Sequence, residues 1–358
     1  MMKKLSEKTW STYPLATIFT VDSGVRLTTS NKVSGKTPFI GATDNSNGVT
    51  GFISNTNKSL DNHVLGVNYN GAPGIAFYHP YKAIFSDDVK RLHLKHFNAN
   101  PNTMLFMKEI IMKQRFKYSY GYKFKADRML RQKLNLPVTS KNQPDYPYME
   151  QYVKLVKEKL INRYKNFLQA QLVLLKHVDI PELAEARWKP FRIDDIFDEI
   201  ASGKIKSVKK LISQENGISL LGATNRNNGI VDNISRLSFD NKKIQSGNCI
   251  AFVQTGEGSV GYATYQPKSF ISSGNANYGY ASWLNPFTGL FFVTSQNKLR
   301  LKYNYGYIRS KNRLQADKVM LPVDRFNKPD YQYMEQYVKN LMLQKYQQYL
   351  VFLNNSEL

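Results

Sequence analysis

The sequence predicts a mixed α/β chain that contains two tandem copies of one globular domain, with a long helix after each copy. Three observations support this prediction: segments of the first half recur in the second, short β-rich runs alternate with glycine turns inside each copy, and a helical pattern closes each copy. We place the first globule at residues 1–140, a helix and linker at 141–187, the second globule at 188–325 and the second helix at 326–358.

The composition indicates a folded, strongly basic protein. The chain has 358 residues, of which 42% are hydrophobic, and this is enough apolar material to build cores and to argue against intrinsic disorder. The 50 Lys and Arg residues outnumber 27 Asp and Glu residues, which gives a formal net charge of +23. No apolar run approaches the roughly 20 residues that a membrane span needs, so we expect no membrane association. A single cysteine and five scattered histidines predict neither a disulfide nor a zinc cage, and a reducing cytoplasm is the expected compartment.

The internal repeat begins with two motifs that occur once in each half. Residues 10–19 and 188–197 share the pattern W-x-x-[YF]-x-[IL]-x-x-I-F. Further along, residues 41–48 and 222–229 share G-A-T-x-x-x-N-G. Both motifs keep their order and approximate spacing, so the resemblance covers a whole domain rather than one short segment.

The repeat continues to the end of each half. A Tyr-Gly-Tyr turn, a Leu-Pro-Val segment and a P-D-Y-x-Y-M-E-Q-Y-V-K block each occur twice. They lie at residues 120–122 and 305–307, 136–138 and 321–323, and 144–154 and 329–339. This period is much longer than the 20 to 50 residues of solenoid repeats, so the sequence predicts two copies of a complete domain.

Within each copy we predict a mixed globule that ends in a strand. Residues 249–253, 261–265 and 290–293 are examples of short β-rich runs, and Asn-Gly or glycine-rich segments separate such runs. The Leu-Pro-Val segment reads as a further strand. A Pro-Asp turn follows it, and the pattern then becomes helical.

The two closing helices carry apolar residues at intervals of three and four. These residues are Met149, Val153, Val156, Leu160 and Phe167 in the first helix, and Met334, Val338, Leu341 and Tyr349 in the second. A helix of about 25 to 30 residues is roughly 38 to 45 Å long and needs a partner for its apolar stripe. We therefore predict that the two helices pack antiparallel and relate the globules by a pseudo-twofold axis.

Clustered positive charge points to double-stranded DNA as the partner. Between Gly258 and Ala316 the sequence has no acidic side chain, and both copies place Lys and Arg beside tyrosines in this region. Such cations bind phosphates and release counterions. The candidate phosphate contacts are Lys117, Lys123, Lys125, Arg128, Lys302, Arg309, Lys311 and Arg313. On charge alone, a solvated basic surface is an equal alternative.

The loops between the shared motifs differ between the copies, which is what two different reading surfaces require. Asn, Gln and Arg side chains can pair with base edges in the major groove. The candidate base-reading residues are Asn45, Asn47, Asn68, Asn225, Arg226, Asn227 and Gln254. Drift after duplication also explains different loops, and Asn47 and Asn228 precede glycines, where asparagine commonly serves a turn with positive φ.

Each candidate motif for catalysis, a cofactor or a metal lacks a feature that this chemistry requires or has a better structural interpretation. Residues 256–261 fit G-x-G-x-x-G, but a strand-like run follows and the next acidic residue is Asp317, so a turn between strands is the better interpretation. His93 and His96 lack a third metal ligand. The trio Asp145, Glu150 and Lys154 recurs as Asp330, Glu335 and Lys339 at the head of the second helix, which favours acids that cap and stabilise the first turn over a nuclease site. We infer no catalytic residue, no metal site and no cofactor in this chain.

The repeated motifs resemble those of the specificity (S) subunit of restriction-modification systems, of type I or of the BcgI-like type IIB kind. The W-x-x-[YF] opening, the G-A-T segment and the P-D-Y block carry this resemblance over nearly the whole chain. It implies that each globule is a target recognition domain that reads one half of a bipartite DNA sequence. It also implies that the helices set the spacing and help to dock two methyltransferase (M) subunits, which bind S-adenosylmethionine, and that a restriction (R) subunit or a fused nuclease cuts.

Two other classes of function stay open at this point. A stand-alone DNA-acting enzyme would methylate or cleave DNA without a partner. A protein-binding scaffold would show no salt-dependent affinity for a duplex even when its partners are present. The sequence does not give the bases recognised, the gap length or the stoichiometry.

Overall fold

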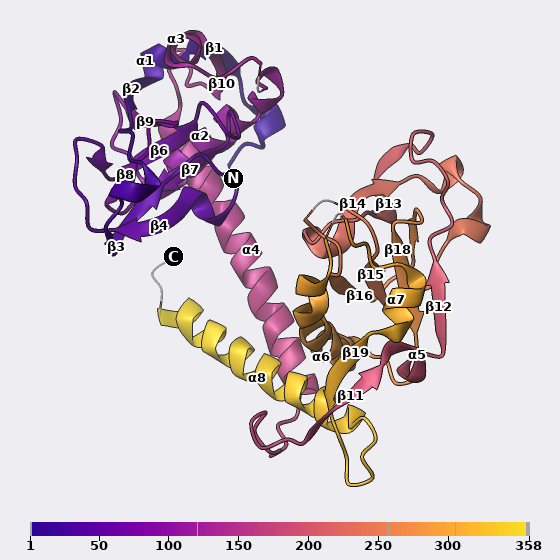
Figure 1. The fold of residues 1–358 in the computed structure, drawn as a ribbon. Helices are drawn as coiled ribbons and strands as arrows, with labels where there is room; N and C mark the ends of the chain where they lie inside the picture. Colours follow the sequence, from indigo (N-terminus) through magenta and orange to yellow (C-terminus); the bar gives the residue numbers. More distant parts are fainter. Residues whose placement is uncertain (1, 120, 257, 305, 356–358) are drawn as a thin grey trace. The chain divides into compact units, whose positions relative to one another are not determined.

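The computed structural model describes residues 2–119, 121–256, 258–304 and 306–355. The chain forms two compact units, Met1–Tyr164 and Lys165–Leu358, and each is described here by itself. Helices and sheets occur in both units, as the mixed α/β prediction requires (Figure 1). The predicted domain boundaries stay predictions, because the division between the units falls inside the long helix α4 (Tyr146–Leu174).

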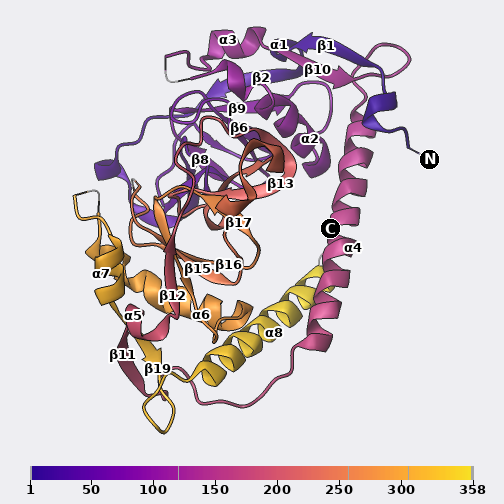
Figure 2. The same ribbon diagram turned by 90° about the vertical axis from the view of Figure 1, so that its right-hand side faces the viewer.

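The first unit contains three small sheets among its described residues. In Figure 2 the outer pair, β1 (Trp10–Pro14) and β10 (Lys133–Pro137), lies beside α1 (Leu15–Ile18) and α3 (Ala126–Arg131). A four-stranded antiparallel sheet has the order β2 (Phe19–Ser23), β9 (Val89–Leu94), β6 (Val64–Asn68), β7 (Ala76–His79). The third sheet has the order β4 (Val49–Ile53), β3 (Ser34–Ile40), β8 (Ala83–Phe85), β5 (Leu60–Asp61), with β3 and β8 parallel.

The second unit repeats this topology with one strand fewer in its third sheet among the described residues. Its outer pair is β11 (Trp188–Arg192) and β19 (Lys318–Pro322), with α5 (Ile193–Ile196) and α7 (Lys311–Ala316). Its four-stranded sheet has the order β12 (Glu199–Ser202), β18 (Ala276–Tyr280), β15 (Cys249–Val253), β16 (Ala263–Gln266). Its third sheet has the order β14 (Ile230–Ile234), β13 (Ser213–Leu221), β17 (Phe270–Ser272), again with one parallel pair.

One helix covers the antiparallel sheet of each unit and supplies much of its core. In the first unit α2 (Pro101–Met112) buries Met107 and Ile111 among sheet residues such as Leu65. In the second unit α6 (Pro286–Gln296) buries Phe292 against Phe252 and Phe197. The packed aromatic and aliphatic side chains hold the strands in fixed register, and the loops at the strand ends are therefore presented from a rigid support.

The predicted strand at residues 290–293 is wrong, because these residues lie inside α6. Asn285 caps this helix by accepting hydrogen bonds from the backbone N–H groups of Phe287 and Thr288, at 2.9 and 3.0 Å. Pro286 follows at the first helical position, where its fixed φ favours a helix start. This start signal and burial against the sheet outweigh the β propensity of the Leu-Phe-Phe-Val run.

The long helices α4 and α8 (Tyr331–Asn355) begin at equivalent capping aspartates. The Asp145 carboxylate accepts a hydrogen bond from the Tyr148 N–H at 3.1 Å, and Asp330 accepts one from the Tyr333 N–H at 2.9 Å. These bonds satisfy free donors of the first turn and confirm the predicted capping role for the two aspartates.

The first two turns of these helices contribute buried or half-buried residues to the core of their own globules. Met149 and Met334 are fully buried, Val338 is buried and Val153 is half-buried. The later positions of the predicted apolar stripes are exposed. They are Val156, Leu160, Phe167, Leu341 and Tyr349, with exposures of 39%, 55%, 47%, 41% and 41%.

Within the second unit, the end of α4 packs against α8 with antiparallel direction. The Phe167 and Tyr346 rings lie edge to face at a centroid distance of 6.3 Å. Lys165 Nζ donates to Asn354 Oδ1 at 3.1 Å, while Asn340 Nδ2, earlier in α8, donates to the Val178 carbonyl beyond α4 at 2.7 Å. The direction of packing is as predicted, whereas the pseudo-twofold relation of the globules stays a prediction. No helix in the described part of the chain is long and apolar enough to cross a membrane.

Candidate nucleic-acid interface

Three loops of each unit carry most of the candidate residues. The first loop contacts the second, and the second contacts the third. The GAT loop follows β3 or β13 and comprises residues 41–48 or 222–229. The glycine loop follows β6 or β15 and comprises residues 69–75 or 254–262. The RKY turn follows α2 or α6 and comprises residues 115–125 or 300–310, named for its shared Arg, Lys and Tyr. Tyr120, Glu257 and Tyr305 lie outside the described residues.

Hydrogen bonds to the four-stranded antiparallel sheet hold the GAT loop in each unit. In the first unit Asn68, at the end of β6, donates through Nδ2 to the Thr43 carbonyl at 3.0 Å. In the second unit Asn228 Nδ2 donates to the Tyr265 carbonyl at 2.9 Å, and Gln266 Nε2 donates back to the Asn228 carbonyl at 2.8 Å. Different residues therefore fix the same loop in the two copies.

A close backbone approach joins the glycine loop to the RKY turn at the same place in both units. Gly74 has φ +80°, and a Cβ there would lie 3.1 Å from Cα of Arg115. Gly261 has φ +85°, and a Cβ there would lie 2.9 Å from Cα of Arg300. Both the left-handed backbone and the short distance require glycine, so this junction is a fixed part of the shared framework.

A stack of two tyrosines and one arginine closes each RKY turn. Tyr118 and Tyr122 stack with ring centroids 6.1 Å apart, and the Arg128 guanidinium carbon lies 3.9 Å from the centre of the Tyr122 ring. In the second unit Tyr303 and Tyr307 stack at 5.7 Å, and Arg313 lies 3.9 Å over Tyr307. Each arginine also donates to a backbone carbonyl at 2.8 Å, which fixes its direction.

The inner tyrosine of each stack is a hydrogen-bond donor to a buried acceptor. Tyr118 donates to Gln132 Oε1 at 2.5 Å, and burial raises the pKa of Tyr118 to about 12. Tyr303 donates to the Asp317 carboxylate at 2.8 Å, and its pKa is raised by burial and by that hydrogen bond. Both phenols therefore stay protonated and hold the turn in place at neutral pH.

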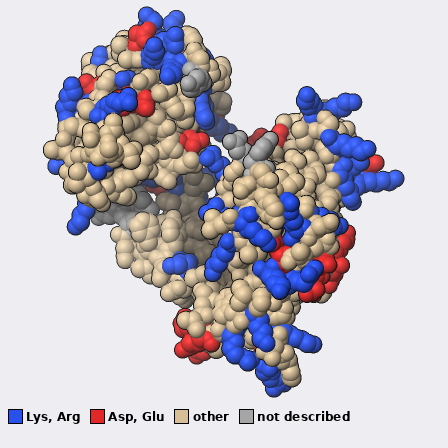
Figure 3. Space-filling model, in the orientation of Figure 1, with Lys and Arg blue, Asp and Glu red and all other residues tan. Residues whose placement is uncertain are grey.

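The structure leaves seven of the eight candidate phosphate contacts at the surface. Lys117, Lys125, Lys302, Lys311 and Arg313 are exposed, and Lys123 and Arg128 are half-buried. Lys302 Nζ lies 2.8 Å from the Asp317 carboxylate, whose hydrogen bond raises the pKa of Lys302. Figure 3 shows that Lys and Arg outnumber Asp and Glu on the face of each unit that it displays.

Arg309 is not a surface residue, and its assignment as a phosphate contact is wrong in this conformation. Its side chain has no exposed surface and its Nε donates to Asp317 Oδ2 at 2.8 Å. Burial lowers the pKa of Arg309, and Asp317 opposes this shift. A guanidinium held in this way cannot reach a phosphate outside the unit.

The candidate base-reading residues of the GAT loops are exposed. Asn45 donates to Asp44 Oδ1 at 2.9 Å, and Asn47 donates to the Tyr81 hydroxyl at 3.0 Å. Asn225, Arg226 and Asn227 occupy the corresponding loop of the second unit, and all three are exposed.

The alternative role for these asparagines is also present in the structure. Asn47 has φ +53° and Asn228 has φ +51°, so both serve the left-handed turn that precedes a glycine, as expected. Asn227, with φ +47°, also adopts this conformation.

The two remaining candidates for base reading lie deeper. Asn68 is 2% exposed, and its amide is used inside the unit to hold Thr43, so its assignment as a base reader is wrong. Gln254 is half-buried, and its Oε1 accepts a hydrogen bond from Asn277 Nδ2 at 2.9 Å. Gln254 therefore stays a candidate with one of its polar groups already paired.

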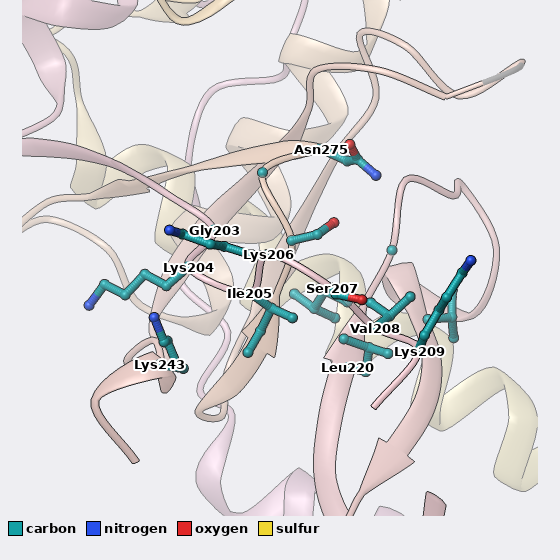
Figure 4. Close-up of a pocket in the computed structure, with 15 residues that line it drawn as sticks. Gly203, Lys204, Ile205, Lys206, Ser207, Val208, Lys209, Leu220, Lys243 and Asn275 are labelled. Atoms are coloured by element: carbon teal, nitrogen blue, oxygen red, sulfur yellow. The ribbon is translucent and has the colours of Figure 1, made fainter. Parts of the chain in front are cut away.

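A lysine-lined pocket in the second unit adds residues that the sequence reasoning missed. The pocket has a volume of about 1020 Å³ and borders the start of the GAT loop at Gly222 and the residue Asn275. Figure 4 shows Lys204 and Lys243 projecting at one end and Lys209 at the other. The cationic residues of this lysine pocket are Lys204, Lys206, Lys209 and Lys243.

The lysine pocket lies next to the GAT loop and the glycine loop of the second unit. Asn275, on its edge, accepts hydrogen bonds at its carbonyl from the N–H groups of Gln254 and Thr255, at 2.9 and 3.3 Å. The corresponding first-unit segment, residues 24–33, carries only Arg26 and Lys32. The run of lysines between 204 and 210 was a visible signal for such a surface.

The motifs considered for other chemistry have structural roles. Residues 256–261 connect the antiparallel strands β15 and β16, which confirms a turn between strands in place of a dinucleotide site. His93 Nε2 lies 3.0 Å from Asp61, and no group of three metal-binding side chains occurs among the residues that the structure describes.

Comparison with protein families gives one model that matches twice. It is the type I restriction modification DNA specificity domain, and it matches residues 7–166 and 185–349. The specificity subunit S.BcgI of a type II restriction enzyme from Heyndrickxia coagulans is 51% identical over 162 residues. That match covers 45% of this chain and 48% of the relative, so the chain aligns with about half the length of this curated relative.

Solved structures of similar fold include a type I restriction-modification S subunit from M. genitalium. It has a TM-score of 0.50 and 14% identity, and the match covers 98% of this chain and 94% of that chain. The HsdS subunit from Thermoanaerobacter tengcongensis matches with a TM-score of 0.32 and 15% identity, over 97% of this chain and 92% of that chain. At these identities the likeness to the first structure concerns the fold alone.

Proposed function

Because this chain belongs to the family of type I restriction modification DNA specificity domains, we propose that it is the DNA-reading subunit of a restriction-modification complex. Each unit reads one half of a bipartite sequence in double-stranded DNA through its GAT loop, glycine loop and RKY turn. The gap between the half-sites follows from the lengths of α4 and α8.

The observation that carries this proposal is the repetition of one rigid loop framework with different side chains on it. The glycine junction and the Tyr-Tyr-Arg stack occur at matching places in both units. The GAT loops that they accompany present Asn45 in one unit and Arg226 in the other. A loop framework that both units share, with different polar and cationic side chains in each unit, is suited to reading two different sequences on one kind of polyanion.

The chemistry of modification belongs, in this proposal, to partner proteins. Two methyltransferase (M) subunits bind S-adenosylmethionine and methylate the target, and a restriction (R) subunit or a fused nuclease cleaves DNA. The chain itself is non-catalytic and acts in the cytoplasm. The exposed apolar positions of α4 and α8, such as Leu160 and Leu341, support a partner-binding role for these helices.

A duplex-binding experiment with the assembled complex tests the proposal. The chain is purified with its methyltransferase partners and is mixed with a library of random 40-base-pair duplexes, and the bound fraction is sequenced. We expect an enriched interrupted sequence, with an affinity that falls steeply as salt rises. A flat salt dependence would identify a protein-binding scaffold, and methylation or cleavage by the chain without partners would identify a stand-alone enzyme.

A further inference from the structure

The Arg309–Asp317 pair lies beneath the reading loops of the second unit and replaces an uncharged pair in the first. The pair is fully buried, with Arg309 Nη2 2.7 Å from Asp317 Oδ2. Phe124 and Gln132 hold the corresponding positions of the first repeat, and both are also buried. The two units therefore carry different side chains at two corresponding positions, while the order of their four-stranded antiparallel sheets is the same.

A third position completes this difference. Gln296, at the end of α6, accepts a hydrogen bond at Oε1 from Arg309 Nη1 and is itself fully buried. The first repeat has Ile111 at the matching place in α2. The second unit thus contains a buried polar trio, Gln296, Arg309 and Asp317, where the first unit contains Ile111, Phe124 and Gln132.

The polar trio forms hydrogen bonds with both the glycine loop and the RKY turn of the second unit. Arg309 Nη1 donates to the Gly261 carbonyl at 3.4 Å, and Gln296 Nε2 donates to the same carbonyl at 3.2 Å. Asp317 accepts hydrogen bonds from Lys302 Nζ and from the Tyr303 hydroxyl, both at 2.8 Å. The Gly261 end of the glycine loop and the start of the RKY turn are therefore held by one buried side-chain cluster.

A stability role does not account for this cluster. Removing two charges from water costs several kcal/mol per ion, and well-packed apolar residues of similar size are often as stable or more so. The first repeat demonstrates such a replacement on the same framework, because Phe124 stacks on Tyr118 at 4.1 Å and Gln132 still accepts from Tyr118. What the ion pair adds is directional bonding to specific loop atoms.

We propose that Arg309 and Asp317, with Gln296, are positioning residues that fix the reading loops of the second unit and so determine base discrimination at one half-site only. Arg309 acts through the backbone carbonyl of Gly261, and Asp317 acts through Lys302 and Tyr303. None of the trio touches DNA. This inference rests on the proposed function, because it assigns the residues that set the specificity of the same interface.

The first repeat supplies the replacement that tests this proposal. The variant Q296I/R309F/D317Q installs the first-repeat trio in the second unit of the full chain, in complex with its methyltransferase partners. Affinity is measured for the duplex selected by the wild-type complex and for duplexes with single base changes in either half. Thermal unfolding and peptide hydrogen exchange at residues 254–262 are measured in parallel.

We expect the variant to fold, with faster hydrogen exchange in the glycine loop. Discrimination against base changes in the second unit's half-site should fall by about tenfold, within the roughly 5- to 150-fold effect of one mismatch. Discrimination in the first unit's half-site should stay at the wild-type value. This split separates a positioning role from a loss of stability, which would weaken binding to every duplex.

Two results would overturn the proposal. One is a folded variant with unchanged discrimination at both half-sites. The other is failure of this variant and of R309F/D317Q, which keeps Gln296, to fold, because the trio would then be a requirement of the fold. A wild-type complex that selects no sequence would instead refute the proposed function, and the two failures are therefore distinguishable.

Discussion

The guanidinium of Arg313 lies over the ring of Tyr307, with its central carbon 3.9 Å from the ring centre. Arg128 and Tyr122 repeat this relationship at the same distance in the first unit. The stack orients each arginine, and its backbone bond leaves other N–H donors of the planar guanidinium available to a phosphate. Both units therefore present one pre-oriented cation at the end of the RKY turn.

Replacing Arg313 with alanine should weaken binding to all duplexes to a similar degree. The loss of one phosphate contact lowers the slope of log affinity against log salt by about 0.9. Titrations of the complex between low and moderate salt measure this slope. R325A is the matched control, because Arg325 also stacks on an aromatic ring, Phe326, but lies in the turn before α8. An R313A slope equal to that of wild type would remove Arg313 from the interface.

The lysine pocket predicts a larger electrostatic contribution from the second unit. Changing Lys204, Lys206, Lys209 and Lys243 together to glutamine should reduce the salt slope by about 3, if most of these lysines neutralise a phosphate. The selected sequence should not change, because backbone contacts carry no base information.

The variant with arginine at the same four positions keeps the positive charges. It therefore separates an effect of lost charge from an effect of lost fold. It should retain the wild-type salt slope. A glutamine variant with a wild-type slope would show that DNA does not pass over the lysine pocket.

His79 should make the first unit sensitive to acid. It is fully buried on β7, beside Tyr81 and Phe85, and burial lowers its pKa from 6.5 to about 4. Below pH 6.5 the His79 side chain is protonated in the unfolded chain but stays neutral in the folded chain. The free energy of unfolding therefore falls as the pH falls toward 4. The loss should reach about 2 to 3 kcal/mol, at about 1.4 kcal/mol for each pKa unit.

Urea unfolding of wild type and H79Q at pH 7 and pH 4.5 checks this expectation. Glutamine is the matched choice, because Gln266 holds the corresponding position of β16 in the second unit. The variant should lose less stability on acidification than wild type. Equal losses would mean that His79 does not contribute to the acid sensitivity.

The lengths of α4 and α8 should set the gap between the half-sites. Removing one heptad from each helix shortens that helix by about 10 Å, which corresponds to the length of about three base pairs of DNA. Sequencing of the duplexes bound by the variant complex gives the new gap. A chain in which the same heptads are replaced by alanine-rich heptads keeps the length and should keep the gap. An unchanged gap in the shortened chain would exclude the spacer role.

Much of the architecture could be predicted because the same motifs occur in both halves of the chain. The repeated motifs predicted two like domains, and the apolar spacing from Met149 onward predicted a long helix where α4 occurs. The run at residues 290–293 was misassigned, because its β propensity is strong while the helix is set by a cap at Asn285 and by burial.

The site was less predictable, because burial depends on contacts that are distant in sequence. Arg309 looks like the neighbouring surface cations, and its contacts with Asp317, Gln296 and the carbonyl of Gly261 place it in the core. Asn68 resembles the loop asparagines, yet the end of β6 directs its amide to Thr43. The lysines at 204–210 could have been found from their charge run, whereas their proximity to Asn275 requires the fold.

The most direct test of the central claim is the pattern of methylated bases in cells that contain the methyltransferase partners with and without this chain. Single-molecule sequencing of the genomic DNA locates each modified base. Two readers on one chain predict an interrupted motif with two specific halves, present only when the chain is present. A continuous motif, or a motif that persists without the chain, would contradict the account.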